Sequence, residues 1–136
     1  CVDHFVEVSP LPVIDLTKVL SSWLEDKRLT RVGIMGTETV MASKLYGKLP
    51  KVEVIVPEGS SLIEVHEAYV TLAKSGVSTL ELQEVFFNKG RALMERGAEA
   101  IMLGGTDLNA AFEGADCGFP IVDCAGVHIE AVAQFI

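Results

Sequence analysis

The chain has 136 residues, of which 49% are hydrophobic and 22% are charged, and its net charge is −8. A chain of this size and composition can build one α/β core. The negative charge argues against a nucleic-acid partner, because a phosphate backbone is bound through clustered Lys and Arg. The apolar runs Val32–Met35 and Ala100–Leu103 both end at glycine, so no membrane span is predicted.

Strand-like and helix-like segments alternate along the chain. Short apolar or β-branched runs between turn residues are typical of strands, and apolar residues recurring at three and four are typical of helices. These patterns predict strands over Leu11–Leu16, Arg31–Met35, Lys51–Val56, Ala98–Leu103 and Pro120–Val122, and helices over Thr17–Leu24, Thr39–Leu49, Ser60–Lys74, Thr79–Arg96 and Ala125–Phe135. Strands joined by helices need crossover connections, so we expect an α/β fold, a parallel sheet with helices on both faces.

The cysteines carry information about cofactors and location. Cys1, Cys117 and Cys124 are odd in number and lack the spacing of metal ligands. Reduced thiols in a cytoplasmic protein are the simplest explanation. Neither nucleotide-binding pattern, GxGxxG or GxxxxGK[ST], occurs. We therefore expect no metal and no nucleotide, and we expect Cys124, at a helix start, to pack in the core.

Three turns are predicted at the edge where an open parallel sheet binds its ligands, beyond the carboxyl ends of the strands. They are Gly36–Thr39, Gly104–Asp107 and Asp123–Cys124. The first leads directly into a helix, whose free N–H groups favour a carboxylate, and Thr37 and Thr39 add hydroxyl groups. A Gly-Thr turn before a helix is also a common helix cap, so both interpretations stay open.

Three segments, in order, resemble the aspartate/glutamate/hydantoin racemase superfamily. Arg31–Tyr46 resembles its central strand and glycine-threonine turn, and Phe119–Phe135 resembles its last strand, aspartate and closing helix. Ala98–Leu108 resembles its second catalytic motif, a strand followed by Leu-Gly-Cys-Thr and then an acid or histidine. In this sequence Gly105 stands at the cysteine position. The segments cover about the last three-fifths of a typical member.

This resemblance implies a domain organisation. Residues 1–16 would be the tail of a first racemase-type domain, residues 17–122 a second α/β domain, and residues 123–136 a closing helix that returns to the first. The sequence opens at Cys1 rather than at a methionine, and we expect it to be a fragment or a processed product. The family's first motif, Cys-Asn-Thr or similar, would fall just before Cys1. Cys1 is either that thiol or a helix-surface or buried cysteine close to the site. The family also implies a homodimer.

The resemblance implies racemisation without metal, pyridoxal phosphate or nucleotide. One base removes the α-proton of an amino acid and a second, on the opposite face, returns one, roles that suit thiols. The implied substrate is aspartate, glutamate or a related carboxylate. The implied substrate-binding residues are Thr37, Glu38, Thr39, Gly105 and Thr106, and the implied acid/base candidates are Asp107 and Cys1. Since Gly105 has no thiol, one face lacks its usual base.

Two histidines, His66 and His128, are further candidates for the site. His128, one turn into the closing helix, lies either on the substrate side or at the surface as a capping residue. His66 stands between Glu64 and Glu67, which favours a solvated helix face.

Three functions remain open. The first is an amino-acid racemase or epimerase. The second is a carboxylate-binding pseudoenzyme, or a one-base isomerase or lyase, with the racemase fold. The third is a non-enzymatic α/β interaction module. Gly105 favours the second over the first, and the set of three motifs favours either of them over the third.

Overall fold

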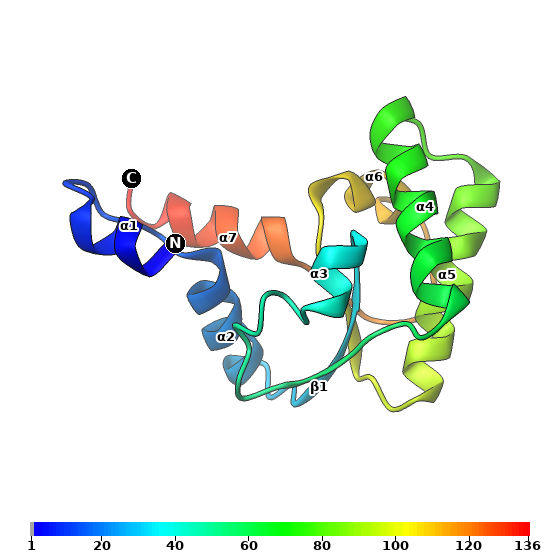
Figure 1. Cartoon of the computed structure of the whole chain (residues 1–136), viewed down its shortest axis with the longest axis horizontal. Helices are drawn as coiled ribbons and strands as arrows, with labels where there is room; N and C mark the ends of the chain where they lie inside the picture. The colour runs from blue at the N-terminus through cyan, green and yellow to red at the C-terminus, as the bar shows by residue number, and fades with distance from the viewer. Residues whose placement is uncertain (1) are drawn as a thin grey trace.

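A four-stranded parallel sheet forms the centre of the computed structural model, which describes residues 2–136 (Figure 1). The strand order is β2-β1-β3-β4. The strands are β1 (Arg31–Met35), β2 (Glu53–Ile55), β3 (Ala100–Leu103) and β4 (Ile121–Asp123). The register pairs Met35 with Leu103 and Leu103 with Asp123, so β1, β3 and β4 end together at one edge. The predicted parallel α/β fold is confirmed.

Helices cover both faces of this sheet, as the alternating pattern predicts. Helices α4 (Ser60–Ser75) and α5 (Leu80–Glu95) pack together on one side, and α2 (Leu16–Asp26) and α7 (Cys124–Ala133) pack together on the other (Figure 1). The shorter helical elements are α1 (Val2–Val8), α3 (Glu38–Ala42), the 3₁₀ helix η1 (Thr106–Leu108) and α6 (Asn109–Phe112). Across residues 2–136, every helix is too short or too polar to span a membrane.

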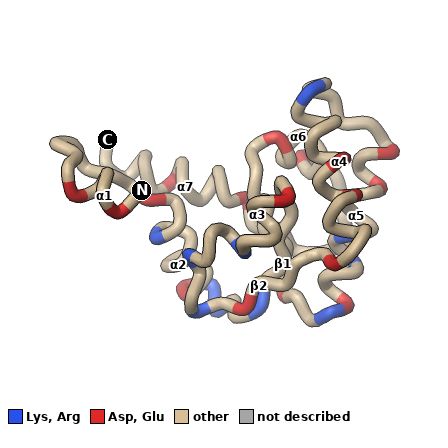
Figure 2. The backbone as a smooth tube through the Cα atoms, viewed as in Figure 1, with Lys and Arg blue, Asp and Glu red and all other residues tan. Residues whose placement is uncertain are grey.

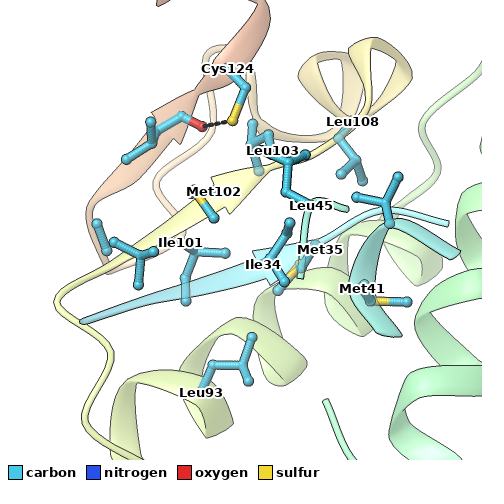
Figure 3. Packing of buried hydrophobic residues seen from close by; sticks show 14 of the residues in the cluster. Ile34, Met35, Met41, Leu45, Leu93, Ile101, Met102, Leu103, Leu108 and Cys124 are labelled. Atoms are coloured by element: carbon cyan, nitrogen blue, oxygen red, sulfur yellow. Dashed lines mark hydrogen bonds between the residues drawn. The ribbon is translucent and has the colours of Figure 1, made fainter. Parts of the chain in front are cut away.

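The core is centred on the two inner strands. All four residues of β3, and the last four of β1, are buried. Strands covered on both faces are apolar throughout rather than alternating, which explains the continuous apolar runs of the sequence. Figure 3 shows Leu93 of α5 on one side of these strands and Cys124 of α7 on the other.

The strand predicted over Leu11–Leu16 is wrong. The segment is irregular and exposed at Leu11, and in the described chain it pairs with no strand. Pro12 has no backbone N–H to donate to a neighbouring strand. Asp15 instead caps α2, since its Oδ1 accepts a hydrogen bond from the backbone N of Thr17 at 2.9 Å. The apolar run is therefore the approach to a helix.

The helix predicted over Thr39–Leu49 is much shorter than expected. Helix α3 ends at Ala42, and Lys44, Leu45 and Tyr46 then adopt left-handed φ angles between 52° and 57°. Leu45 is nevertheless buried, so its apolar character reflects a packed turn rather than a helix face. The long helices α4 and α5 lie within a residue or two of their predicted bounds, and Gly76 ends α4 at a φ of 66°, as predicted. Helices α1, η1 and α6 were not predicted.

Candidate functional site

The turns after β1 and β3 lie against each other at the carboxyl edge of the sheet. The backbone N of Gly104 donates a hydrogen bond to the carbonyl O of Met35 at 2.7 Å. A Cβ atom on Gly104 would lie 2.9 Å from that carbonyl O and 2.8 Å from Cγ1 of Val40. Glycine is needed here because only it allows this close approach. The two predicted turns are thus joined through their backbones.

The first turn uses its hydrogen-bonding groups internally. Thr37 caps α3, because its Oγ1 accepts from the backbone N of Val40 at 3.3 Å. The backbone N of Glu38 donates to Nδ1 of His66 at 3.0 Å. Two of the N–H groups expected for a carboxylate therefore have partners already, and α3 is only five residues long. The side chains of Glu38 and Thr39 remain exposed.

The second turn meets a residue that the sequence motifs do not indicate. Tyr69 of α4 donates its hydroxyl hydrogen to Oδ2 of Asp107 at 3.0 Å. Gly105 is extended, with a φ of −156° and a ψ of 141°, so its conformation does not demand glycine. A Cβ atom at that position would, however, lie 2.5 Å from the Tyr69 hydroxyl oxygen and 2.6 Å from its Cε2. The Tyr69 side chain therefore fills the space that a side chain at position 105 would need. Thr106 stays exposed beside it.

Helix α4 holds both turns. His66 and Tyr69 are three residues apart and lie on the same helix face, since residues at this spacing are neighbours on a helix surface. His66 binds the first turn and Tyr69 binds the second. His66, which was predicted on a solvated helix face, is half-buried, and its Nδ1 accepts a hydrogen bond from the first turn. An apolar-periodicity pattern gives no sign of either contact.

The Tyr69 hydroxyl is held in its protonated form. Partial burial raises its pKa above the ordinary value of 10.0, and the hydrogen bond to Asp107 and the charge of that carboxylate raise it further. At neutral pH the side chain is therefore a neutral phenol that donates to a carboxylate.

A small cavity of about 110 Å³ lies beneath the second turn, lined by Gly104, Gly105 and Thr106 and by Leu45 and Cys124 among others. The Cys124 thiol is only 4% exposed and donates to the carbonyl O of Val122, at 3.8 Å from its Sγ (Figure 3). Burial, with a smaller contribution from the charge of Asp123, raises the pKa of this thiol to about 12. Cys124 is therefore a packed, neutral thiol, and it is no base at neutral pH.

The remaining candidates have structural partners or lie outside the described residues. Asp123 caps α7, because its Oδ1 accepts from the backbone N of Gly126 at 3.0 Å and from Nδ2 of Asn109 at 3.2 Å. Nε2 of His128 lies 2.8 Å from the carbonyl O of Ile14 and ties α7 to the segment before α2. Cys1 falls outside the described residues, so its role stays a prediction.

The distribution of charged side chains and the grouping of possible metal ligands indicate which groups could hold a ligand at this edge of the sheet. Figure 2 shows Lys and Arg gathered mainly in the lower half of the view, around the starts of β1 and β2. The two turns carry hydroxyl groups and acids instead, in the sequences Gly-Thr-Glu-Thr and Gly-Gly-Thr-Asp. Within residues 2–136, no three His, Cys, Asp or Glu side chains are grouped to hold a metal ion. A carboxylate at this edge would therefore be held by hydroxyl and backbone N–H groups.

Comparison with known proteins agrees with this fold. The family model described as Asp/Glu/Hydantoin racemase matches residues 1–132, so the chain belongs to this family. A candidate Asp/Glu racemase from Yersinia pestis superposes with a TM-score of 0.88, and an aspartate racemase homologue from Pyrococcus horikoshii OT3 superposes with a TM-score of 0.82. Each is 20% identical in sequence, and each match covers 98% of this chain and 60% of the other. A search of curated proteins gave no match.

Proposed function

We propose that the protein is a cofactor-independent amino-acid racemase or epimerase that acts on aspartate, glutamate or a related carboxylate. The observation that carries this proposal is the pair of joined turns at the ends of β1 and β3, with the Tyr69–Asp107 pair lying over Gly105. Membership of the Asp/Glu/Hydantoin racemase family supports it. Because the chain spans 60% of the length of the similar solved structures, we propose that it supplies one side of the site.

The substrate would lie across the exposed surface of the two turns. In this arrangement the hydroxyls of Thr39 and Thr106 donate to the substrate carboxylates. Thr37 fixes the first turn, and Gly105 leaves room for the Tyr69 side chain beside the substrate. The exposed carboxylate of Glu38 suits an α-ammonium group. Hydroxyl donors fit an acidic protein surface, because the substrate is then captured locally rather than by a basic field.

The opposite face of the substrate needs a second acid/base group. We propose that Cys1, or a thiol shortly before it, supplies this group, in a first domain to which residues 1–16 and the closing helix 123–136 belong. Helices α1 and α7 support that division with exposed apolar side chains, such as Phe5 at 58% and Ile129 at 67%. We further propose a homodimer, which the family resemblance implies, and a cytoplasmic location, which reduced thiols favour.

Proton exchange tests this proposal. The purified protein, with any native residues that precede Cys1, is incubated in D₂O with L- or D-aspartate or glutamate. NMR should show loss of the α-proton signal, and chiral chromatography should show the opposite enantiomer. Exchange of one enantiomer without inversion would indicate a one-base enzyme. Stabilisation by succinate without exchange would indicate a binding protein, because a ligand that binds only the folded state raises its stability. If the protein shows neither proton exchange nor stabilisation by succinate, a non-enzymatic interaction module is the function that remains.

A further inference from the structure

We propose that Tyr69 takes the place of the family's second thiol, with its hydroxyl exchanging a proton with the substrate Cα on the face above Gly105. The inference rests on the proposed function, since it assigns one of the two acid/base groups of that same site. It changes the interpretation of Gly105, which on sequence alone suggests that one face of the substrate has no base.

Space around Gly105 is the first argument. The Tyr69 hydroxyl oxygen lies 2.5 Å from the point where a Cβ at position 105 would be built, so a cysteine there would require the phenol to leave its present position beside Asp107. Gly105 is extended, and ordinary residues adopt such a backbone, so the glycine serves the space rather than the conformation. Tyr69 therefore occupies the place that a cysteine side chain at position 105 would otherwise take.

The second argument is the hydrogen bond from Tyr69 to Asp107, which gives the phenol a route for its own proton. When the substrate Cα–H bond breaks, its electron pair stays on Cα and spreads into the adjacent carboxylate group. The proton forms a new O–H bond on Tyr69, while the original hydroxyl proton moves to Oδ2 of Asp107. The phenol ends neutral and Asp107 ends as a carboxylic acid. The reverse sequence returns a proton to Cα.

This route agrees with the electrostatics of the pair. A free phenolate beside a carboxylate would place two negative charges about one hydrogen bond apart. Burial, with the hydrogen bond to Asp107 and the charge of Asp107 adding to it, raises the pKa of Tyr69 and disfavours that state. Transfer of both protons together avoids it, because the net charge of the pair then goes from −1 to 0 and never reaches −2. Asp107 acts through Tyr69 rather than on the substrate, and its exposed position lets it exchange its proton with water.

A tyrosine-to-phenylalanine change is the sharpest test. Tyr69→Phe removes the hydroxyl alone, and Tyr46→Phe is the matched control, since Tyr46 is the other tyrosine of the chain and its side chain is 60% exposed. In D₂O, Tyr69→Phe should slow α-proton exchange of one enantiomer by about 10²–10⁴-fold, the range of general acid–base catalysis. Exchange of the other enantiomer should fall much less. Tyr46→Phe should match the wild type.

A replacement of the phenol by a thiol provides the rescue. Gly105→Cys combined with Tyr69→Ala puts a thiol into the vacated space, whereas Gly105→Cys alone meets the Tyr69 ring. The double variant should regain exchange of the affected enantiomer, with a rate that rises as a thiol ionises, near pH 8.5 for an unperturbed cysteine. The single variant Tyr69→Ala is the control for the double variant, and it should exchange the α-proton of the affected enantiomer as slowly as Tyr69→Phe does.

Each outcome decides the inference. Stereoselective loss in Tyr69→Phe together with recovery in the double variant supports it. Wild-type exchange of both enantiomers in Tyr69→Phe overturns it and leaves the proposed function intact. Equal loss for both enantiomers without recovery also overturns it, because the side chain is then only structural. A wild-type protein that exchanges no α-proton overturns the proposed function, and this inference falls with it.

Discussion

Two Gly-Thr-acid triplets end neighbouring parallel strands of this sheet, and the structure uses them differently. In Gly36–Glu38 the threonine caps a short helix and the next backbone N–H is bound by His66, so the turn is closed on itself. In Gly105–Asp107 the threonine is exposed and the acid is bound by Tyr69. The same three residue types therefore form a turn with internal hydrogen bonds after one strand, and a turn with an exposed threonine and a Tyr69–Asp107 pair after the other. A different α4 side chain contacts each triplet, His66 the first and Tyr69 the second.

The largest effect on the free energy of unfolding should come from the Cys124 thiol, which lies beneath the second turn. Folding keeps Cys124 protonated to about pH 12, whereas an unfolded thiol ionises near pH 9. Between these values the unfolded state binds fewer protons, so the free energy of unfolding falls as the pH rises. From pH 9 to 11 this loss should reach about 2 kcal/mol, because the dependence approaches about 1.4 kcal/mol per pH unit only once the unfolded thiol is fully ionised. The free energy of unfolding, measured with urea at several pH values, should fall more steeply with pH for the wild type than for Cys124→Ala, because the variant has no thiol to ionise. Parallel curves would show that the thiol ionises freely in the folded protein.

The junction between the turns should be more sensitive on the second side. Gly104→Ala forces a Cβ against a backbone carbonyl, and we expect it to lower the free energy of unfolding by about 1–3 kcal/mol. Gly36→Ala is the matched control, because its Cβ would meet a Val40 methyl group at 3.2 Å and would lie at an ordinary contact distance, 3.5 Å, from the backbone carbonyl carbon of Gly104. Thermal or urea unfolding measures both. Equal losses in the two variants would mean that the contact of Gly104 with Met35 is not what holds the turns together.

The two threonines should separate stability from binding. Thr37→Val removes a helix cap and should cost about 1 kcal/mol of stability, whereas Thr106→Val should stay within about 0.5 kcal/mol. Binding should show the opposite order: Thr106→Val should weaken succinate or aspartate by about 1–3 kcal/mol through an unpaired carboxylate oxygen. Calorimetry and the ligand-induced rise in melting temperature measure this. If Thr37→Val and Thr106→Val lose the same amount of ligand affinity, the two turns do not differ in the roles proposed for them.

Much of the fold could be predicted from the sequence because it depends on local patterns. Buried strands give the runs around Ile34 and Ile101, and helical periodicity with a terminal Gly76 gives α4. Leu11–Leu16 misled because an apolar approach to a helix has the same composition as a short strand. The Tyr69–Asp107 contact joins residues 38 positions apart, so no spacing rule indicates it. The positions of Gly105 and Thr106 at a strand end could be predicted, but the group that faces them could not.

The exclusion between Gly105 and Tyr69 restricts the order in which this site can have diverged. A cysteine at position 105 meets the phenol ring while Tyr69 is present, whereas a smaller residue at position 69 leaves only empty space. A cysteine at position 105 would thus require the tyrosine to move or to be replaced, so a change at position 69 should precede or accompany one at position 105. Family members should consequently pair a bulky aromatic residue at one position with glycine at the other, and a cysteine with a small neighbour.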